Sequence, residues 1–318
     1  MKRSIALICL ALALAVSACG DSDSETTGGG ATSLDVATFP FAGSAPLFVG
    51  MKHGFFEEEG LDIKPQMLVS GPVAITSVVS QENPIGFTSS VPLLIARSQG
   101  LPVRAISPGE LAGEDTAHAG SAVVVNADSP IRDAEDLEGK TIGVVALKDI
   151  GDVTIKESLR KQGADPSKFE FVEIPFPEMN AALEAEEVDA AWLVEPFTSQ
   201  AKAAGARVIA YNYVETAPNL TVALYFTTEE YEEGHPETVD GFAAAMRKSL
   251  AYSEAHPREV REIIPTYTEI PAAVAKIMVL PTWKPQIEPD KLELLGELSE
   301  QYGLIDEAPT LDELLATD

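Results

Sequence analysis

Residues 140–196 read KTIGVVALKDIGDVTIKESLRKQGADPSKFEFVEIPFPEMNAALEAEEVDAAWLVEP. In this stretch, short apolar runs alternate with longer segments whose apolar residues recur at intervals of three and four. Runs of the first kind are typical of buried strands, and segments of the second kind are typical of amphipathic helices. The predicted strands are 140–146, 169–174 and 188–194, and the predicted helices are 152–161 and 177–186. This alternation indicates βα units in series and therefore an α/β protein with mostly parallel sheets.

The same alternation continues on both sides of this stretch. Further strands are predicted at 34–38, 61–68, 84–88, 121–125 and 207–211, with helices at 46–56, 72–79, 92–99 and 196–205. After about Thr216 the pattern turns helical, with predicted helices at 235–255, 257–267, 271–279 and 290–302. We expect this helical region to pack back on the first of two lobes. The chain crossings near 107–119 and 213–220 are rich in Gly or Pro and are the expected hinge.

The N-terminus has the features of a secretion signal. Lys2 and Arg3 precede the apolar run 5–16, which is too short to span a bilayer, and small residues lead to Cys19. This ending resembles the bacterial lipobox, in which the cysteine is acylated. We therefore expect a lipoprotein signal peptide over 1–19, a flexible polar tether over 20–33 and an extracytoplasmic, lipid-anchored protein. Ordinary secretion with an incidental cysteine is the alternative.

Composition excludes several classes of function. The chain has two cysteines, and loss of Cys9 with acylation of Cys19 leaves no thiol for disulfides, zinc ligation or nucleophilic attack. Its 50 acidic residues outnumber 22 basic ones, for a formal net charge of −28. Such a charge repels nucleic acids and anionic lipids, although it leaves the charge of a small ligand open. The remaining length suggests two lobes, because single cores stop growing near ~250–300 residues.

Four segments together resemble the nitrate/sulfonate/taurine family of ABC-transporter substrate-binding proteins, which also includes binders of the thiamine pyrimidine precursor. These segments are 46–63 (PLFVGMKHGFFEEEGLDI), 136–144 (DLEGKTIGV), 181–197 (AALEAEEVDAAWLVEPF) and 283–305. The resemblance implies a type II periplasmic-binding-protein fold, in which two lobes close on a ligand in the cleft between them. It places lobe 1 at 34–112 plus 218–318 and lobe 2 at 113–217. One departure is 82–87 (ENPIGF), where the family usually has glycine with an acidic residue.

The resemblance further implies how the protein acts. A monomeric lipoprotein would capture a small polar organic nutrient and deliver it to a membrane permease with its ATPase, without a cofactor, a metal or catalysis. A sensor that is not coupled to transport is one alternative. A pyrimidine-synthase-like enzyme on the same fold is another, but the lipobox argues against it. In addition, the four histidines are poorly placed for catalysis and lack metal-ligand spacing.

Ligand-facing groups are expected at strand ends and helix starts of both lobes, where α/β proteins bind their ligands. The candidates are Thr38, Phe39, Ser44, Ser70, Gly71, Thr88, Ser89 and Ser90 in lobe 1, and Lys148, Asp149, Phe176, Trp192 and Glu195 in lobe 2.

Most of these candidates also have a purely structural interpretation. The serines 44, 89 and 90 can cap helices, and Trp192 can belong to the core. Glu195 can cap the helix that follows it, and Lys148 can be a solvated loop charge. The aromatic candidates and Glu195 favour a nitrogen heterocycle, whereas Lys148 and the helix starts keep a sulfonate or nitrate possible.

Overall fold

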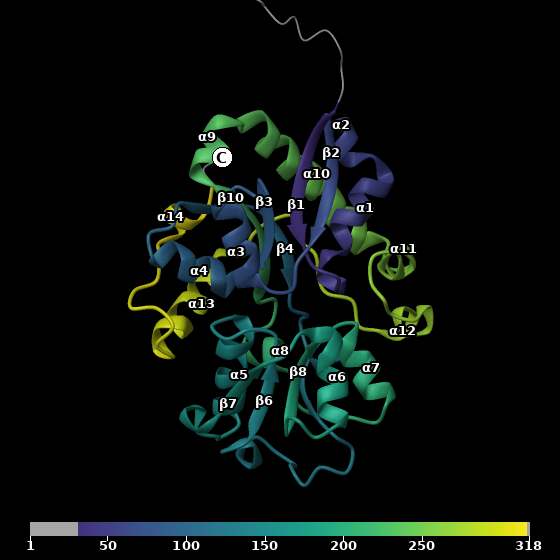
Figure 1. The fold of residues 1–318 in the computed structure, drawn as a ribbon, viewed down its shortest axis with the longest axis vertical. Helices are drawn as coiled ribbons and strands as arrows, with labels where there is room; N and C mark the ends of the chain where they lie inside the picture. The colour runs from purple at the N-terminus through teal and green to yellow at the C-terminus, as the bar shows by residue number, and fades with distance from the viewer. Residues whose placement is uncertain (1–30, 317–318) are drawn as a thin grey trace, which may run out of the picture. The chain divides into compact units, whose positions relative to one another are not determined.

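The computed structural model describes residues 31–316. The predicted signal peptide and Cys19 lie outside the described residues. The described residues form two sheets of five strands. Helices flank both sheets (Figure 1). This arrangement confirms the predicted α/β fold with two lobes. None of the helices in the described range is long and apolar enough to span a membrane.

The sheet of the first lobe has the strand order β2-β1-β3-β10-β4. Its strands are β1 (Thr32–Thr38), β2 (Leu61–Met67), β3 (Ile85–Ser89), β4 (Val103–Leu111) and β10 (Thr221–Thr228). β1 pairs in parallel with β2 and β3, whereas β10 runs antiparallel to its neighbours β3 and β4. Four of the five strands therefore point the same way, and their carboxyl ends meet at one edge.

The sheet of the second lobe repeats this plan with the order β7-β6-β8-β5-β9. Its strands are β5 (Ser121–Val125), β6 (Thr141–Val144), β7 (Glu170–Glu173), β8 (Ala190–Val194) and β9 (Arg207–Ala210). β6 pairs in parallel with β7 and β8, and β5 is the one strand that runs against the others. Both sheets are thus mixed, with one reversed strand in the fourth position.

The helices follow the strands as crossover connections and then form a C-terminal group. The first lobe carries α1 (Ala45–His53), α2 (Phe55–Glu58), α3 (Gly71–Val79) and α4 (Ser90–Ser98), and the second carries α5 (Ile150–Lys161), α6 (Phe176–Glu184), α7 (Phe197–Ala203) and α8 (Asn212–Thr216). Short 3-10 helices lie at Ala42–Ser44, Thr116–His118, Glu135–Leu137, Pro166–Lys168 and Ile264–Thr266.

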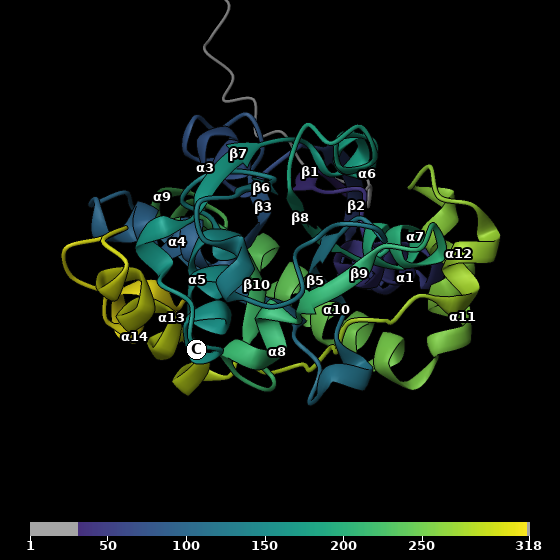
Figure 2. The same cartoon turned by 90° about the horizontal axis from the view of Figure 1, so that it is seen from below.

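The C-terminal helices pack largely on the first lobe. They are α9 (Glu229–Gly234), α10 (Pro236–Ala255), α11 (Pro257–Ile263), α12 (Ala272–Ile277), α13 (Pro289–Gln301) and α14 (Leu311–Leu314). α10 contacts α1, α2 and β4, and α13 contacts α4 of the first lobe and α5 of the second. Figures 1 and 2 place α11 and α12 on one flank and α13 and α14 on the opposite flank.

Two strands of the first lobe depart from the sequence prediction. The hinge was expected from residue 107, but 107–111 belongs to β4, and the helical pattern expected after Thr216 is interrupted by β10. β4 contains Pro108 and Gly109, residues that argue against a central strand, and its pairing with β10 has register shifts there. The chain therefore crosses between the lobes only at 112–120 and 217–220 before it reaches the C-terminal helices.

Local details also differ from the prediction at the first helix. Gly54 adopts a left-handed backbone (φ 74°) and divides the predicted helix into α1 and α2. Ser44 stands at the N-cap position of α1 but makes no capping hydrogen bond. Its hydroxyl instead accepts a hydrogen bond of 3.0 Å from the Thr38 hydroxyl inside the lobe. β1 also begins at Thr32, inside the range predicted as tether.

Candidate functional site

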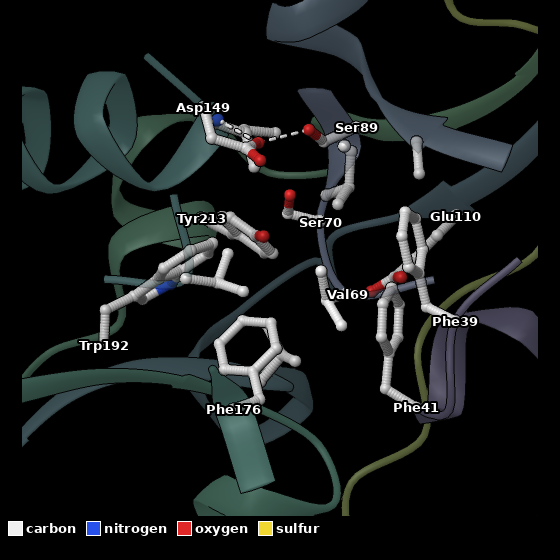
Figure 3. A pocket seen from close by; sticks show the side chains of 16 residues that line it. Phe39, Phe41, Val69, Ser70, Ser89, Glu110, Asp149, Phe176, Trp192 and Tyr213 are labelled. Carbon is white, nitrogen blue, oxygen red and sulfur yellow. Dashed lines mark hydrogen bonds between the residues drawn. The ribbon is translucent and has the colours of Figure 1, made fainter. Parts of the chain in front are cut away.

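A cavity lies where the carboxyl edges of the two sheets face each other. Figure 3 shows side chains from both lobes around it. The lining residues are Phe39, Phe41, Val69, Ser70, Gly71, Ser89, Glu110, Val222 and Ala223 from the first lobe, and Val145, Asp149, Ile150, Phe176, Trp192, Val194 and Tyr213 from the second. Strand ends and helix starts supply most of this lining, as the sequence analysis expects.

The structure brings seven of the thirteen predicted ligand-binding residues to this cavity. They are Phe39, Ser70, Gly71, Ser89, Asp149, Phe176 and Trp192. The other six lie outside its lining: Thr38, Ser44, Thr88, Ser90, Lys148 and Glu195.

Among the six outside, Thr38 and Ser44 bond to each other, and the Ser90 hydroxyl donates to the Thr221 carbonyl at 2.6 Å. Thr88 is fully buried, and its hydroxyl has no hydrogen-bond partner among the described residues. Lys148 is exposed on a loop with a left-handed backbone (φ 56°). Lys148 is therefore a solvated charge on a loop, which was its structural interpretation.

Glu195 follows β8 but points away from the cavity. Its carboxylate accepts hydrogen bonds from the Ser199 backbone N–H at 3.1 Å, the Ser199 hydroxyl at 2.8 Å and the Val279 N–H at 3.1 Å. Burial raises the pKa of Glu195, and the Ser199 hydroxyl partly opposes this. The carboxylate thus caps the first turn of α7 and holds the segment after α12, which is the structural alternative to ligand binding.

Aromatic side chains form one wall of the cavity. Trp192 is 1% exposed, and its indole N–H donates to the Ser121 hydroxyl at 2.8 Å. The ring of Phe176 lies edge-on to Trp192, with centroids 5.3 Å apart. From the other lobe, Phe41 faces Phe176 at 6.4 Å and stacks on Phe39 at 5.4 Å. Trp192 is therefore both part of the core and part of the cavity wall.

Glu110 lines the cavity but is not among the thirteen residues predicted from the sequence. It lies in β4, a strand that the sequence did not predict. For this reason Glu110 was not predicted to lie near a strand end. Its side chain is buried, and burial raises the pKa of the carboxyl to about 8. No side chain of the described residues hydrogen-bonds to it. Glu110 is therefore mostly protonated at neutral pH and can donate as well as accept a hydrogen bond.

Asp149 lies across the cavity from Glu110, at the start of α5 (Figure 3). Its carboxylate accepts from the Ile150 N–H at 2.6 Å and from the Ser89 hydroxyl of the first lobe. Burial raises its pKa to about 6, and the hydrogen bonds from Ser89, Ile150 and the Gly71 N–H limit this rise. Asp149 therefore carries a negative charge at neutral pH that the first lobe stabilises.

The charge that the cavity lining can carry is negative. None of the sixteen described residues that line it is a lysine, arginine or histidine. Glu110 and Asp149 provide two carboxyl groups, and Tyr213 adds a buried hydroxyl. Burial raises the pKa of Tyr213, and the nearby Glu110 and Asp149 raise it further. The cavity is thus complementary to hydrogen-bond donors that are neutral or positively charged.

The lobes touch each other around the cavity. The Ala42 N–H donates to the Glu195 carbonyl at 3.1 Å, and the Tyr302 hydroxyl donates to Glu157 of α5 at 2.7 Å. The enclosed volume is about 40 Å³, far below the ~300–1,000 Å³ of typical small-molecule pockets. A cavity of about 210 Å³ adjoins it and shares the walls of Phe39, Phe41, Val69 and Phe176. Entry of a ligand therefore requires the lobes to separate.

Within residues 31–316 no group of three or more His, Cys, Asp or Glu side chains could hold a metal ion.

Comparison with known proteins connects this architecture to named relatives. A Brachyspira hyodysenteriae protein named "Putative ABC transporter periplasmic binding protein" is 27% identical over 289 residues, covering 85% of this chain and 79% of the relative. The taurine-binding periplasmic protein of Escherichia coli is 25% identical over 59% of this chain and 57% of its own length. The formylaminopyrimidine-binding protein of Halalkalibacterium halodurans is 23% identical over 72% and 68%, respectively.

A solved structure gives the same result for the fold. The periplasmic aliphatic sulphonate binding protein of Escherichia coli superimposes with a TM-score of 0.72 at 17% identity, over 89% of this chain and 97% of that chain. At this identity the likeness concerns the two-lobe fold alone. Residues 42–260, well over half of the chain, match the profile of the NMT1/THI5-like family. The resemblance seen in the sequence is therefore confirmed, and the chain belongs to the NMT1/THI5-like family.

Proposed function

We propose that this protein is the extracytoplasmic substrate-binding lipoprotein of an ABC importer. It captures a small nitrogen-containing ring compound, neutral or positively charged, between its lobes and presents it to a membrane permease. Family membership and the named binding-protein relatives support the class of function. The ligand closes the lobes because its contacts with both of them exist only in the closed form.

The ligand class rests on one observation, the pairing of two carboxyl groups with aromatic walls in a cavity whose lining has no basic side chain. A sulfonate or nitrate would enter beside Asp149 without a compensating cation, which is unfavourable in a buried site. An amino group or ring N–H can instead donate to Asp149 or Glu110. A planar ring can stack against Phe176 and Phe41.

The relatives do not decide between a sulfonate and a nitrogen heterocycle, whereas the lining residues favour the heterocycle. One relative binds taurine and one solved neighbour binds sulphonates, whereas another relative binds a formylaminopyrimidine. The side chains of the cavity in this chain match the last of these chemistries better. The expected ligand contact is therefore not Glu195, which lies outside the cavity lining, but Asp149 and Glu110, which belong to it.

Thermal unfolding of the full chain in mild detergent, after unfolding and refolding to remove bound ligand, tests the proposal. The panel contains aminopyrimidines and other nitrogen heterocycles, alkanesulfonates, taurine and nitrate. A true ligand at one hundred times its dissociation constant adds about 2.7 kcal/mol to the free energy of unfolding. We expect this stabilisation from a heterocycle and none from nitrate or simple sulfonates.

Two variants make the test specific to the cavity. Phe176→Ala removes an aromatic wall and is expected to weaken the heterocycle at least tenfold, about 1.4 kcal/mol. Lys148→Ala changes an exposed residue outside the lining and is expected to leave the affinity unchanged. Stabilisation by sulfonates or nitrate alone, or a larger loss with Lys148→Ala, would contradict the proposed ligand class.

A further inference from the structure

Asp149 occupies an unusual position for a residue of the second lobe. It caps its own helix α5 through the Ile150 N–H, and the same carboxylate accepts from the Ser89 hydroxyl of the first lobe. Gly71, the first residue of α3, lies beside this carboxylate, and its backbone N–H helps to lower the pKa of Asp149. Figure 3 shows the Asp149 side chain directed at Ser89. One carboxylate therefore joins the helix starts of both lobes.

The start of α3 lacks a cap from its own lobe. Ser70 stands at the N-cap position of this nine-residue helix, but its side chain makes no capping hydrogen bond. The Asp149 carboxylate lies beside this end of the helix, where the positive end of the helix dipole favours its charge.

A further buried donor lies at the same place. The hydroxyl of Thr88 is fully buried and has no hydrogen-bond partner among the described residues. A β-carbon added to Gly71 would lie 2.8 Å from this hydroxyl oxygen and 3.2 Å from an Asp149 carboxylate oxygen, so both oxygens flank the same backbone atom. The hydroxyls of Thr88 and Ser89 and the start of α3 therefore lie close together in the first lobe. Such convergent donors are the usual means of binding an oxyanion.

We propose that Asp149 is an internal anion that fills an anion-binding subsite of the first lobe, formed by the start of α3 with Thr88 and Ser89. This inference rests on the proposed function, in that the interlobe cavity is taken as the ligand site. It makes Asp149 the residue that excludes sulfonates, sulfate and carboxylates from the cavity. An incoming anion would have to displace a carboxylate that the Ser89 hydroxyl and the Ile150 N–H already hold.

Replacement of Asp149 by a small residue tests the inference. Asp149→Ser removes the carboxylate but keeps a side chain that can cap α5. Asp149→Asn removes the charge and keeps the volume, so the subsite stays filled. Asp152→Asn removes a neighbouring charge in the first turn of α5 that pairs with Lys156 and lies outside the cavity lining. Titration calorimetry of the full chain with methanesulfonate, and separately with inorganic sulfate, measures each variant.

We expect the dissociation constant of Asp149→Ser for methanesulfonate to be at least tenfold lower than that of the wild type. Asp149→Asn and Asp152→Asn are expected to stay within a factor of about three of the wild type, because the subsite remains filled in both. Adding Thr88→Val to Asp149→Ser should abolish the gain, since it removes the unpartnered donor. If Asp149→Ser does not fold cooperatively, Asp149→Gly replaces it, because glycine is also tolerated at an N-cap.

Each contrary outcome contradicts a specific part of the inference or of the proposed function. No gain of anion affinity in a folded Asp149→Ser or Asp149→Gly protein contradicts the existence of the subsite. An equal gain in Asp149→Asn means that charge alone repels anions and that no subsite is occupied. An equal gain in Asp152→Asn means that the effect is not local. Tight binding of methanesulfonate by the wild type would instead refute the proposed function, whereas heterocycle binding by the wild type without a gain in the variants refutes only this inference.

Discussion

Glu110 and Asp149 are two buried carboxyl groups of one cavity, and their pKa values are shifted to different extents. Both pKa values are raised, to about 8 for Glu110 and to about 6 for Asp149. The difference has a simple cause: Asp149 accepts hydrogen bonds from Ser89 and Ile150 that favour its charged form, and Glu110 has no such support. At neutral pH the cavity therefore holds one charged and one mostly neutral carboxyl, so it offers both an acceptor and a donor to a ligand.

Glu110→Gln should remove a pH dependence of stability. The folded pKa of Glu110, about 8, exceeds the value of 4.5 for an unperturbed carboxyl, so the folded state holds its proton more tightly than the unfolded state. The resulting stability is present below about pH 4.5 and is lost as the pH rises to about 8. The upper limit of this loss is about 5 kcal/mol.

Urea unfolding of wild type and Glu110→Gln at several pH values between 5 and 9 measures this difference. The free energy of unfolding of the variant, relative to the wild type, should increase with pH up to about pH 8 and then level off. A constant difference across this range would show that Glu110 titrates normally.

Among the elements, α5 connects most directly to the cavity. Its N-cap is Asp149, its first residue Ile150 lines the cavity, and its second residue Gly151 packs under the Trp192 ring. A β-carbon at Gly151 would lie 2.6 Å from two atoms of that ring, closer than real β-carbons approach. The glycine therefore allows the helix to approach β8 and fixes where the indole stands in the cavity wall.

Gly151→Ala should destabilise the protein, although alanine is the better helix former. Relief of the clash would push the Trp192 ring toward the cavity, and overpacking of this kind costs about 1–3 kcal/mol. Gly234→Ala, at the end of α9, serves as the control because no atom lies within 4 Å of its added β-carbon. It should be neutral or stabilising by up to about 1 kcal/mol. Chemical unfolding measures both, and equal stability of the two variants would contradict the packing argument.

In the whole molecule, contacts outside the cavity also hold the lobes together. α13 packs on α4 of the first lobe and on α5 of the second, and the Tyr302 hydroxyl donates to Glu157 at 2.7 Å. A hydrogen bond to a charged group typically contributes about 1.5–3 kcal/mol. Because this bond does not touch the cavity lining, it can favour the closed form without selecting a ligand.

Tyr302→Phe should therefore weaken ligand binding by up to about tenfold while the order of preference among ligands stays the same, because only the closing equilibrium changes. Tyr231→Phe, on α9 and away from the second lobe, is the control and should bind like the wild type. Calorimetric titration with the best heterocycle and one weaker analogue checks both points. A changed ranking of the two ligands would mean that Tyr302 acts on the site itself.

Most elements of this fold could be predicted from local sequence alone. Strand β5 was predicted with its observed bounds, and α10 and α13 to within a residue at either end, because their apolar periodicity and flanking prolines are local signals. The two strands that were missed, β10 and β4, are the fourth strand and the edge strand of the first sheet, and β10 comes from a part of the chain far from its neighbours. β4 tolerates Pro108 and Gly109 because it is an edge strand and its pairing with β10 is irregular there.

The candidate site also combines features that the local sequence predicts with features that it does not predict. The sequence by itself determined that Ser89, Asp149, Phe176 and Trp192 stand at strand ends and helix starts, since these positions follow from the order of βα units. Only the tertiary structure decided that Asp149 meets Ser89, 60 residues away, that Glu195 turns to cap α7, and that Glu110 enters the cavity uncompensated. The physical reason is that hydrogen-bond partners and burial depend on segments that only lobe packing brings together, and these set the charge of the cavity.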